Sequence, residues 1–304
     1  MIREEYDFCD VKEYLNKKND LLIVGEPCFE DRSKYFYNLW NSNNKDILVL
    51  KKIDIDSICY RYLESGVSVK NGTISLSYGI HRLFKGLNID QKNTLLDLSS
   101  LDHILIMFLS KVLITQTIPR ALFASYIRPE KYSVQSGDIG FSLSDGIIGV
   151  KSVPGFVKRE SDIQTLCSFI GFEGNRLKSI IESVNNVNKF VPIVAFPSGE
   201  PQWYNVTMWN CMEILQSEPL DFAIHKCFSE SIFEAIGLLQ TCIQPDEKVV
   251  LAPLGTRCHS MASAIFACKH PHTRIIYDNA IEKERRTEGI ACIKIYHLSS
   301  FLNT

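Results

Sequence analysis

The sequence predicts an α/β fold with two tandem Rossmann-like halves, each built around a parallel sheet and related to the other by an internal duplication. Three observations lead to this expectation. The chain has 304 residues, 45% hydrophobic and 22% charged, which is ordinary for a globular protein and long enough for about two domains. Short apolar runs alternate with amphipathic helical segments, as in strands joined by crossover helices. The same order of elements occurs twice along the chain.

The first half contains four expected strands, each a short apolar run: residues 21–25, 47–50, 94–98 and 121–126. The first run ends at a glycine and is followed by a helix that places Phe36 and Trp40 on one face. Ser99-Ser100 is expected to form the turn, or the N-cap, before a second helix over residues 101–114.

The second half repeats this order with four expected strands: residues 166–170, 191–196, 248–252 and 274–278. The helix after the first of them carries Leu177, Ile180, Ile181 and Val184 at i, i+3, i+4 and i+7, which predicts one apolar stripe. Further helices are expected over residues 229–241 and, with many small side chains, over residues 258–268.

Matching residues support the duplication hypothesis. The pairs are Phe29-Glu30 with Phe172-Glu173, Ser99-Ser100 with Gly255-Thr256, and Tyr126 with Tyr277. In both halves, Phe-Glu and a nearby Arg follow a strand that ends at glycine. The alternative is that the halves are unrelated, because any two α/β domains share the general order of elements. The expected boundaries are residues 1–135 for the first half, 136–160 for a linker rich in Gly, Ser and Asp, and 161–304 for the second half.

The first candidate site is a turn between a strand and a helix, at the end of the sheet where parallel strands bind ligands. Gly255-Thr256 precedes a helix whose N-terminal N–H groups attract anions, and Arg257 adds a positive charge. Thr256 is equally typical of an ordinary helix cap. Ser99 and Ser100 hold the corresponding position in the first half, without the glycine.

Two further groups of charged residues follow expected strands. Arg32 and Arg176 either reach a ligand phosphate or form structural salt bridges with Glu30 and Glu173, whose charges suit the first turn of a helix. The basic loop over residues 283–289, which contains Arg286, either wraps a phosphate or is a solvated charged segment.

A strand followed by Gly255-Thr256-Arg257 and a helix of small residues resembles the fourth-strand motif of CARF domains, and two such units in one chain resemble the SAVED arrangement. These families are Rossmann-like sensors of cyclic oligonucleotides in prokaryotic antiviral defence. The resemblance covers both halves at the level of fold, but only Gly-Thr-Arg and its neighbours at the level of motif. The first half departs from it, with Ser99-Ser100-Leu101 and no basic residue. The resemblance implies a nucleotide or cyclic-oligonucleotide ligand and, because no effector segment is visible, an effector protein chain from the same operon as partner.

Two enzymatic alternatives stay open. Glu26 with Asp54 and Asp56 is similar to the carboxylate set that holds Mg²⁺ in TOPRIM-like nucleases, although exposed alternating charge explains the pattern as well. A hydrolase acting on nucleotides would instead use Glu30 or Glu173 as its acid or base. The sequence identifies no cofactor, and it contains no catalytic signature of high specificity.

Charge, apolar runs and cysteine content argue against several classes of protein, including non-specific nucleic-acid binders, secreted proteins and membrane proteins. The net charge is −2, so no overall basic excess favours non-specific binding of nucleic acid. We see no secretory signal and no apolar run near the ~20 residues of a membrane span. Ten scattered cysteines without a CxxC pair fit the reduced thiols of the cytoplasm. Cys268, His270 and His272 lack a convincing fourth ligand, so we expect no metal site. A purely structural subunit is the remaining alternative.

Overall fold

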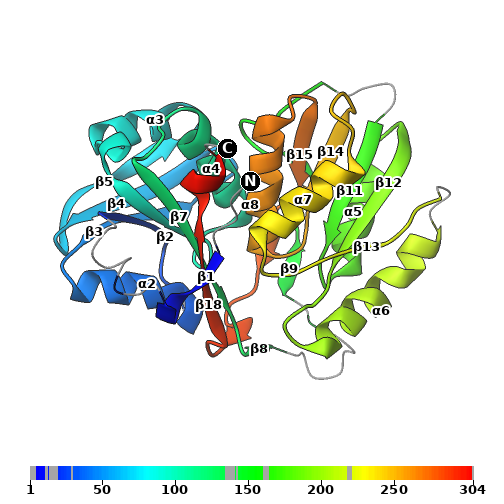
Figure 1. Cartoon of the computed structure of the whole chain (residues 1–304), viewed down its shortest axis with the longest axis horizontal. Helices are drawn as coiled ribbons and strands as arrows, with labels where there is room; N and C mark the ends of the chain where they lie inside the picture. The colour runs from blue at the N-terminus through cyan, green and yellow to red at the C-terminus, as the bar shows by residue number, and fades with distance from the viewer. Residues whose placement is uncertain are drawn as a thin grey trace. The chain divides into compact units, whose positions relative to one another are not determined.

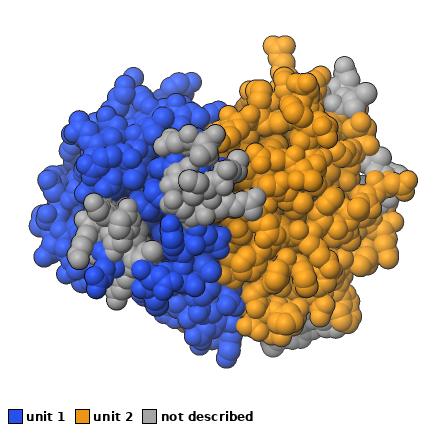
Figure 2. Space-filling model, viewed as in Figure 1, with its two compact units in different colours: residues 1–131, 287–304 blue, residues 132–286 orange. Residues whose placement is uncertain are grey.

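The computed structural model describes residues 5–10, 13, 20–28, 30–133, 141, 143–159, 164–217 and 221–302. The chain divides into two compact units: unit 1 is residues 1–131 with 287–304, and unit 2 is residues 132–286 (Figure 2). The expected α/β class is confirmed, because each unit contains a sheet with parallel central strands and helices between them (Figure 1). Within the described part of the chain, no helix combines the length and the apolar character that a membrane crossing needs.

The main sheet of unit 1 is mixed. Its strands are β1 (Glu5–Asp7), β2 (Leu21–Gly25), β3 (Asp46–Lys52), β4 (Ser57–Glu64), β5 (Val67–Ser75), β6 (Asn93–Asp97), β7 (Ala121–Arg128) and β18 (Cys292–His297). Their order is β1-β18-β7-β6-β2-β3-β4-β5, in which β7, β6, β2 and β3 are parallel and the outer strands are antiparallel. The helical elements are α2 (Asp31–Ser42), α3 (Leu76–Gly86), the short 3-10 helix η1 (Ile89–Gln91), α4 (His103–Thr115) and α9 (Leu298–Leu302).

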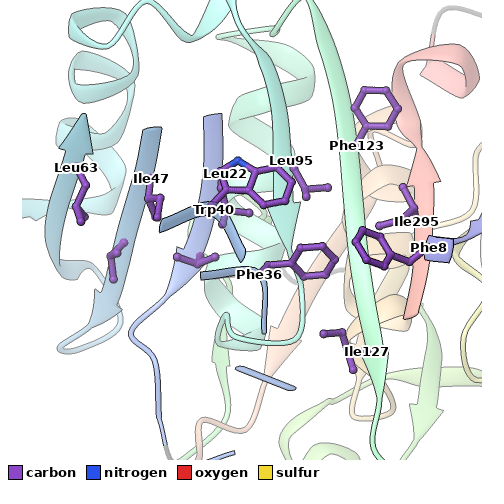
Figure 3. Packing of buried hydrophobic residues seen from close by; sticks show 12 residues of the cluster. Phe8, Leu22, Phe36, Trp40, Ile47, Leu63, Leu95, Phe123, Ile127 and Ile295 are labelled. Carbon is purple, nitrogen blue, oxygen red and sulfur yellow. The ribbon is translucent and has the colours of Figure 1, made fainter. Parts of the chain in front are cut away.

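The core of unit 1 forms where one face of this sheet meets α2. Side chains alternate across a strand, so Leu22 and Val24 of β2 point to the same side, where they join Phe36 and Trp40 of α2 (Figure 3). The Phe36 and Trp40 ring centroids lie 5.9 Å apart in an edge-to-face arrangement. The expected apolar face of this helix is thus the face that it buries.

The division of the chain differs from the expected boundaries at the C-terminus. Residues 287–304 belong to unit 1, because β18 pairs with β7 and Ile295 of β18 lies in the same buried cluster as Phe36. Antiparallel pairing between segments this far apart leaves no local pattern in the sequence. Part of the expected linker is also structured, as β9 (Ser144–Ile147) and β10 (Lys151–Ser152).

The main sheet of unit 2 is parallel except at one edge. Its strands are β10, β11 (Gln164–Ile170), β12 (Val187–Ala195), β13 (His225–Cys227), β14 (Val249–Pro253) and β15 (Thr273–Tyr277), in the order β10-β15-β14-β11-β12-β13. Only β10 runs antiparallel to its neighbour. The helices are α5 (Gly174–Ser183), α6 (Pro201–Ser217), α7 (Ile232–Cys242) and α8 (Arg257–Lys269). Two small pairs complete the description: β16 (Ala280–Glu282) with β9, and β17 (Thr287–Glu288) with β8 (Lys131–Tyr132).

Small side chains let α8 lie close to its neighbours. Ala262, Ser263 and Ala264 are buried, and the helix packs against α7, β14 and β15. The apolar stripe expected on α5 is also buried at Leu177 and Ile180. Both helices that follow the central strands β11 and β14 are therefore packed against the rest of unit 2 along a buried face.

A glycine stands at the carboxyl end of a central strand in both units, Gly25 as the last residue of β2 and Gly171 directly after β11, for the same steric reason. A Cβ atom on Gly25 would lie 1.9 Å from the carbonyl oxygen of Ser100, and one on Gly171 would lie 2.4 Å from that of Leu254. Only glycine allows such a close approach of two backbones. In both units, the backbone at the end of one central strand thus packs directly against the loop that follows the neighbouring strand. These strands are β2 and β6 in unit 1, and β11 and β14 in unit 2.

The structure shifts the second expected match between the two halves, which paired Ser99-Ser100 with Gly255-Thr256. The N-cap of α4 is Asp102 and that of α8 is Thr256, each two residues after the carbonyl that meets the strand-ending glycine. Asp102, and not Ser100, therefore holds the position of Thr256. Glu30 and Glu173 do correspond, as the N-cap residues of α2 and α5. Phe29 lies outside the described residues, and the duplication stays a prediction.

Candidate functional site

The carboxyl ends of β11 and β14 define the candidate site of unit 2. β11 lies between β12 and β14 in the sheet. The next strand along the chain, β12, pairs with one edge of β11, and the later strand β14 pairs with the other edge, so the strand order reverses between β11 and β14. Open α/β sheets bind ligands outside the carboxyl ends of the strands at such a switch point. Glu173 and Arg176 follow β11, and Gly255, Thr256 and Arg257 follow β14.

Thr256 forms the N-cap of α8, as the structural interpretation of this turn predicts. Its hydroxyl donates to the carbonyl oxygen of Ser229 at 2.7 Å and accepts the backbone N–H of His259 at 3.4 Å. The backbone N–H of Thr256 donates in return to Nδ1 of His259 at 3.3 Å, which completes a capping box. A Cβ atom on Gly255 would lie 2.5 Å from the same nitrogen. The Gly-Thr pair therefore shapes the beginning of the helix.

His259 is a buried, neutral member of this cap. Its ring stacks on Phe169 with 4.5 Å between centroids. Because Nδ1 accepts the Thr256 N–H, the proton is assigned to Nε2, which lies 3.4 Å from the carbonyl oxygen of Phe228. Burial lowers the pKa of His259 from 6.5 to about 4, and the contact with the Phe228 carbonyl offsets only part of this effect.

Stability is expected to fall by about 2 kcal/mol between pH 7 and pH 5 because of His259. In the unfolded chain this imidazole takes up a proton near pH 6.5, whereas in the folded chain its pKa is about 4. The unfolded state thus binds more protons in this window, and stability is lost as the pH falls. Urea unfolding at the two pH values measures the loss. The variant His259→Gln keeps a capping side chain without titrating, so an unchanged pH dependence in it would contradict the assignment.

Arg257 and Arg286 meet at a single carboxylate. Nη2 of Arg286 lies 2.6 Å from Oε2 of Glu282, and Nη2 of Arg257 lies 3.6 Å from Oε1 of the same side chain. The two arginine side chains are only 11% and 7% exposed, whereas Glu282 is 33% exposed. Arg257 is the first residue of α8, and Glu282 is the last residue of β16. The three side chains together carry a net charge of +1 at the carboxyl edge of unit 2.

Arg176 belongs to a second cluster on the same edge. Its Nε and Nη2 atoms donate to the two carboxylate oxygens of Asp278 at 2.7 and 2.8 Å, and Nη2 also donates to the Tyr277 hydroxyl at 2.9 Å. Asp278 is fully buried. Burial by itself lowers the pKa of Arg176, but Tyr277 and Asp278 raise it above its ordinary value. This geometry is that of a structural ion pair.

Glu173 also takes part in the fold. Its Oε1 accepts the backbone N–H groups of Leu143 and Ser144, each at 3.0 Å, and the Ser144 hydroxyl at 2.8 Å. Its Oε2 lies 3.8 Å from Nη1 of Arg176. Glu173 thereby ties the start of α5 to the segment around β9, which matches the structural interpretation of this acidic residue.

The candidate residues of unit 1 form short contacts within that unit. Glu30 and Arg32 are both buried, with Oε2 and Nε 3.0 Å apart. The Ser99 hydroxyl accepts the backbone N–H of Ile127 at 2.7 Å. The Ser100 hydroxyl accepts that of Gly25 at 2.9 Å. The serine contacts connect a loop to strands β7 and β2, and the Glu30–Arg32 contact lies at the beginning of α2, so each of the four residues has a structural role.

The carboxylates of the nuclease alternative have separate contacts. Asp54 accepts the backbone N–H of Asp56 at 2.9 Å. Asp56 accepts the Ser75 hydroxyl at 2.7 Å, and Oε1 of Glu26 lies 3.5 Å from Arg61. Among the residues that the structure describes, no three His, Cys, Asp or Glu side chains gather as metal ligands would. This arrangement does not provide the carboxylate cluster that the nuclease alternative requires.

Sequence reasoning missed Glu282 and Asp278, the acidic partners of the three arginines. The available signal was position, because Asp278 directly follows a buried strand and Glu282 lies four residues before Arg286.

Comparison with protein-family models and with curated proteins gives no match for this chain.

Proposed function

We propose that this protein is a nucleotide-binding sensor or accessory subunit of a bacterial antiphage defence system, and that it acts through a partner protein. The observation that carries the binding proposal is the meeting of Arg257 and Arg286 at the carboxyl edge of unit 2. The ligand class includes mononucleotides and cyclic oligonucleotides. The defence role and the partner rest on the resemblance of Gly255-Thr256-Arg257 to the CARF motif.

The arginine pair has the chemistry that phosphate recognition needs. A guanidinium group is planar and always charged, and its fork of N–H donors matches the oxygens of a phosphate. Arg257 and Arg286 are almost fully covered, so their field is weakly screened by water. Arg257 also lies in the first turn of α8, where the helix dipole favours negative charge. These features support an anionic ligand of small size.

The contacts of the acidic residues favour binding over hydrolysis. Glu173 accepts three hydrogen bonds from the segment around β9, and Glu30 is buried against Arg32. Both carboxylates are therefore occupied by contacts within the fold, at the beginning of α5 and of α2. A binding module is therefore the function that this geometry supports best.

Isothermal titration calorimetry with mononucleotides and cyclic oligonucleotides tests the proposal. We expect a member of the panel to bind, and Arg257→Ala to weaken its binding at least thirtyfold, or about 2 kcal/mol, because a nearly buried phosphate contact is lost. Arg82→Ala, at an exposed position on α3, is the matched control and should leave binding unchanged.

Two other outcomes would contradict the proposal. Mg²⁺-dependent cleavage of a nucleic acid that Asp54→Ala abolishes would establish the nuclease alternative. Absence of both binding and cleavage, together with a stable complex with the product of a neighbouring gene, would establish the structural subunit.

A further inference from the structure

We infer that the outward side of α6 is an interaction surface for a second copy of this chain, and that two α6 helices pack there antiparallel with Trp209 at their centre. We call this surface the α6 face. Around Trp209 it consists of the residues three, four and seven positions away on either side: the exposed Gln202, Asn205, Met212, Glu213 and Gln216, and the half-buried Val206. The inference goes beyond the proposed function, because it involves neither the arginine pair nor a ligand.

The α6 face lies opposite the side through which α6 joins its unit. This helix, yellow-green in Figure 1, packs against α5 and β12. Its buried residues recur every four positions and so form one stripe along the helix: Trp203, Thr207, Cys211 and Leu215. Trp209 lies on the other side and is 69% exposed, and Met212, three residues later, is 37% exposed. An exposed tryptophan beside an exposed methionine is typical of a surface that binds another protein.

The α6 face also lacks the charges that usually keep the outer side of a helix in water. Glu213 is the only acidic or basic residue among the 17 of α6. The neighbouring helix α5 carries the usual pattern, an exposed ion pair between Lys178 and Glu182 with side chains 64% and 66% exposed. The outer side of α6 is therefore better suited to burial against a partner than that of α5.

The order of residues along α6 points to a second copy as this partner. Trp209 is the midpoint of the helix, with eight residues of α6 on either side. Across a twofold axis at Trp209, a residue after the midpoint in one copy faces the residue equally far before it in the other. Met212 thus faces Val206, Glu213 faces Asn205, and Gln216 faces Gln202. The first pair is apolar, and in the other two an oxygen acceptor faces an amide N–H donor.

The antiparallel arrangement keeps the acidic residues of the two copies apart. Each Glu213 lies four residues from the midpoint, so the two are separated by about 12 Å along the helix axis. This distance exceeds the Debye length of about 8 Å at physiological ionic strength, and their repulsion is therefore screened. A parallel pair in the same register would place the two Glu213 side chains directly opposite each other. The charge pattern thus favours the antiparallel dimer.

Sedimentation equilibrium of the chain without nucleotide, between about 1 and 300 μM, tests the inference. We expect the mass to rise with concentration from that of one chain toward twice that value. Trp209→Ala should weaken the dimer at least about thirtyfold, because the interface loses two central tryptophans. The site is exposed, so the variant should fold, which circular dichroism checks. The matched control is Tyr78→Ala, at an 80% exposed aromatic side chain on α3, which should leave the dimer Kd unchanged.

Charge variants at Asn205 test the antiparallel register. Asn205→Lys places a positive charge opposite Glu213 of the other copy, so it should tighten the dimer about threefold, since each contact occurs twice. Asn205→Glu places a like charge there and should weaken the dimer by about the same factor. Both effects should disappear when Glu213→Gln is also present, because the opposing charge is then gone.

Three results would overturn the inference. They are a chain that keeps the mass of a single copy at about 300 μM, a dimer whose Kd changes less than about twofold in Trp209→Ala, and a dimer that Asn205→Lys and Asn205→Glu weaken equally. A monomeric chain that instead binds lipid vesicles or a basic amphipathic peptide through Trp209 would assign the α6 face to another occupant and overturn it as well. Because no nucleotide is present, these results leave the proposed function to its own test.

Discussion

Replacing Asp278 with alanine is expected to destabilise unit 2 by about 3–5 kcal/mol. Asp278 is fully buried and receives two hydrogen bonds from Arg176, at 2.7 and 2.8 Å. Without this carboxylate, the guanidinium of a nearly covered arginine keeps its positive charge but loses its main counter-ion. Urea unfolding at pH 7, followed by the fluorescence of Trp203 and Trp209 in unit 2, measures the loss.

A double variant distinguishes an uncompensated charge from lost packing. Arg176→Met with Asp278→Leu removes both charges and fills the space with apolar atoms, so it should cost clearly less than Asp278→Ala alone. Two results would show that this ion pair does not hold α5 to the end of β15. One is a loss of less than about 1 kcal/mol of unfolding free energy in Asp278→Ala, and the other is a double variant as unstable as Asp278→Ala.

The variant Gly25→Ala should destabilise unit 1 by about 3 kcal/mol or more. The added Cβ atom would lie 1.9 Å from the carbonyl oxygen of Ser100 and 2.6 Å from its carbonyl carbon. These are backbone atoms, so a side-chain rotation cannot relieve the clash. The hydrogen bond from the Gly25 N–H to the Ser100 hydroxyl would also be strained. Chemical unfolding followed by circular dichroism measures the effect.

Gly86→Ala is the matched control for this substitution. Gly86 is the last residue of α3, and a Cβ atom there would meet nothing within 4 Å. Alanine has the higher helix propensity, so this variant should be neutral or more stable by up to about 1 kcal/mol. Equal stabilities of the two alanine variants would contradict the steric role of Gly25.

Local patterns were enough to predict the central strands. The run that ends at Gly25 is β2, and the runs over residues 166–170 and 248–252 overlap β11 and β14. Strands that are buried on both faces consist of apolar residues throughout, so they stand out from their neighbours. The hairpin of β4 and β5 escaped prediction because β5 is exposed along most of its length and lacks this signal.

Pairing between distant segments could not be predicted in the same way. Arg176 was singled out because of its position after a strand, but its contact with Asp278, which follows a strand far along the chain, depends on the sheet order. The same is true of Arg257, whose contact with Glu282 depends on the path of the chain after β15. Sequence position thus identified charged residues at the sheet edge, and the fold decided which of them meet.

The most direct test of the proposed site is the crystal structure of this protein with a bound nucleotide from the calorimetric panel. Our account predicts that a phosphate of the ligand lies within hydrogen-bond distance of the guanidinium groups of both Arg257 and Arg286. A nucleotide bound elsewhere, for example beside Ser99 and Ser100 in unit 1, with the Arg257–Glu282–Arg286 cluster unchanged, would contradict it.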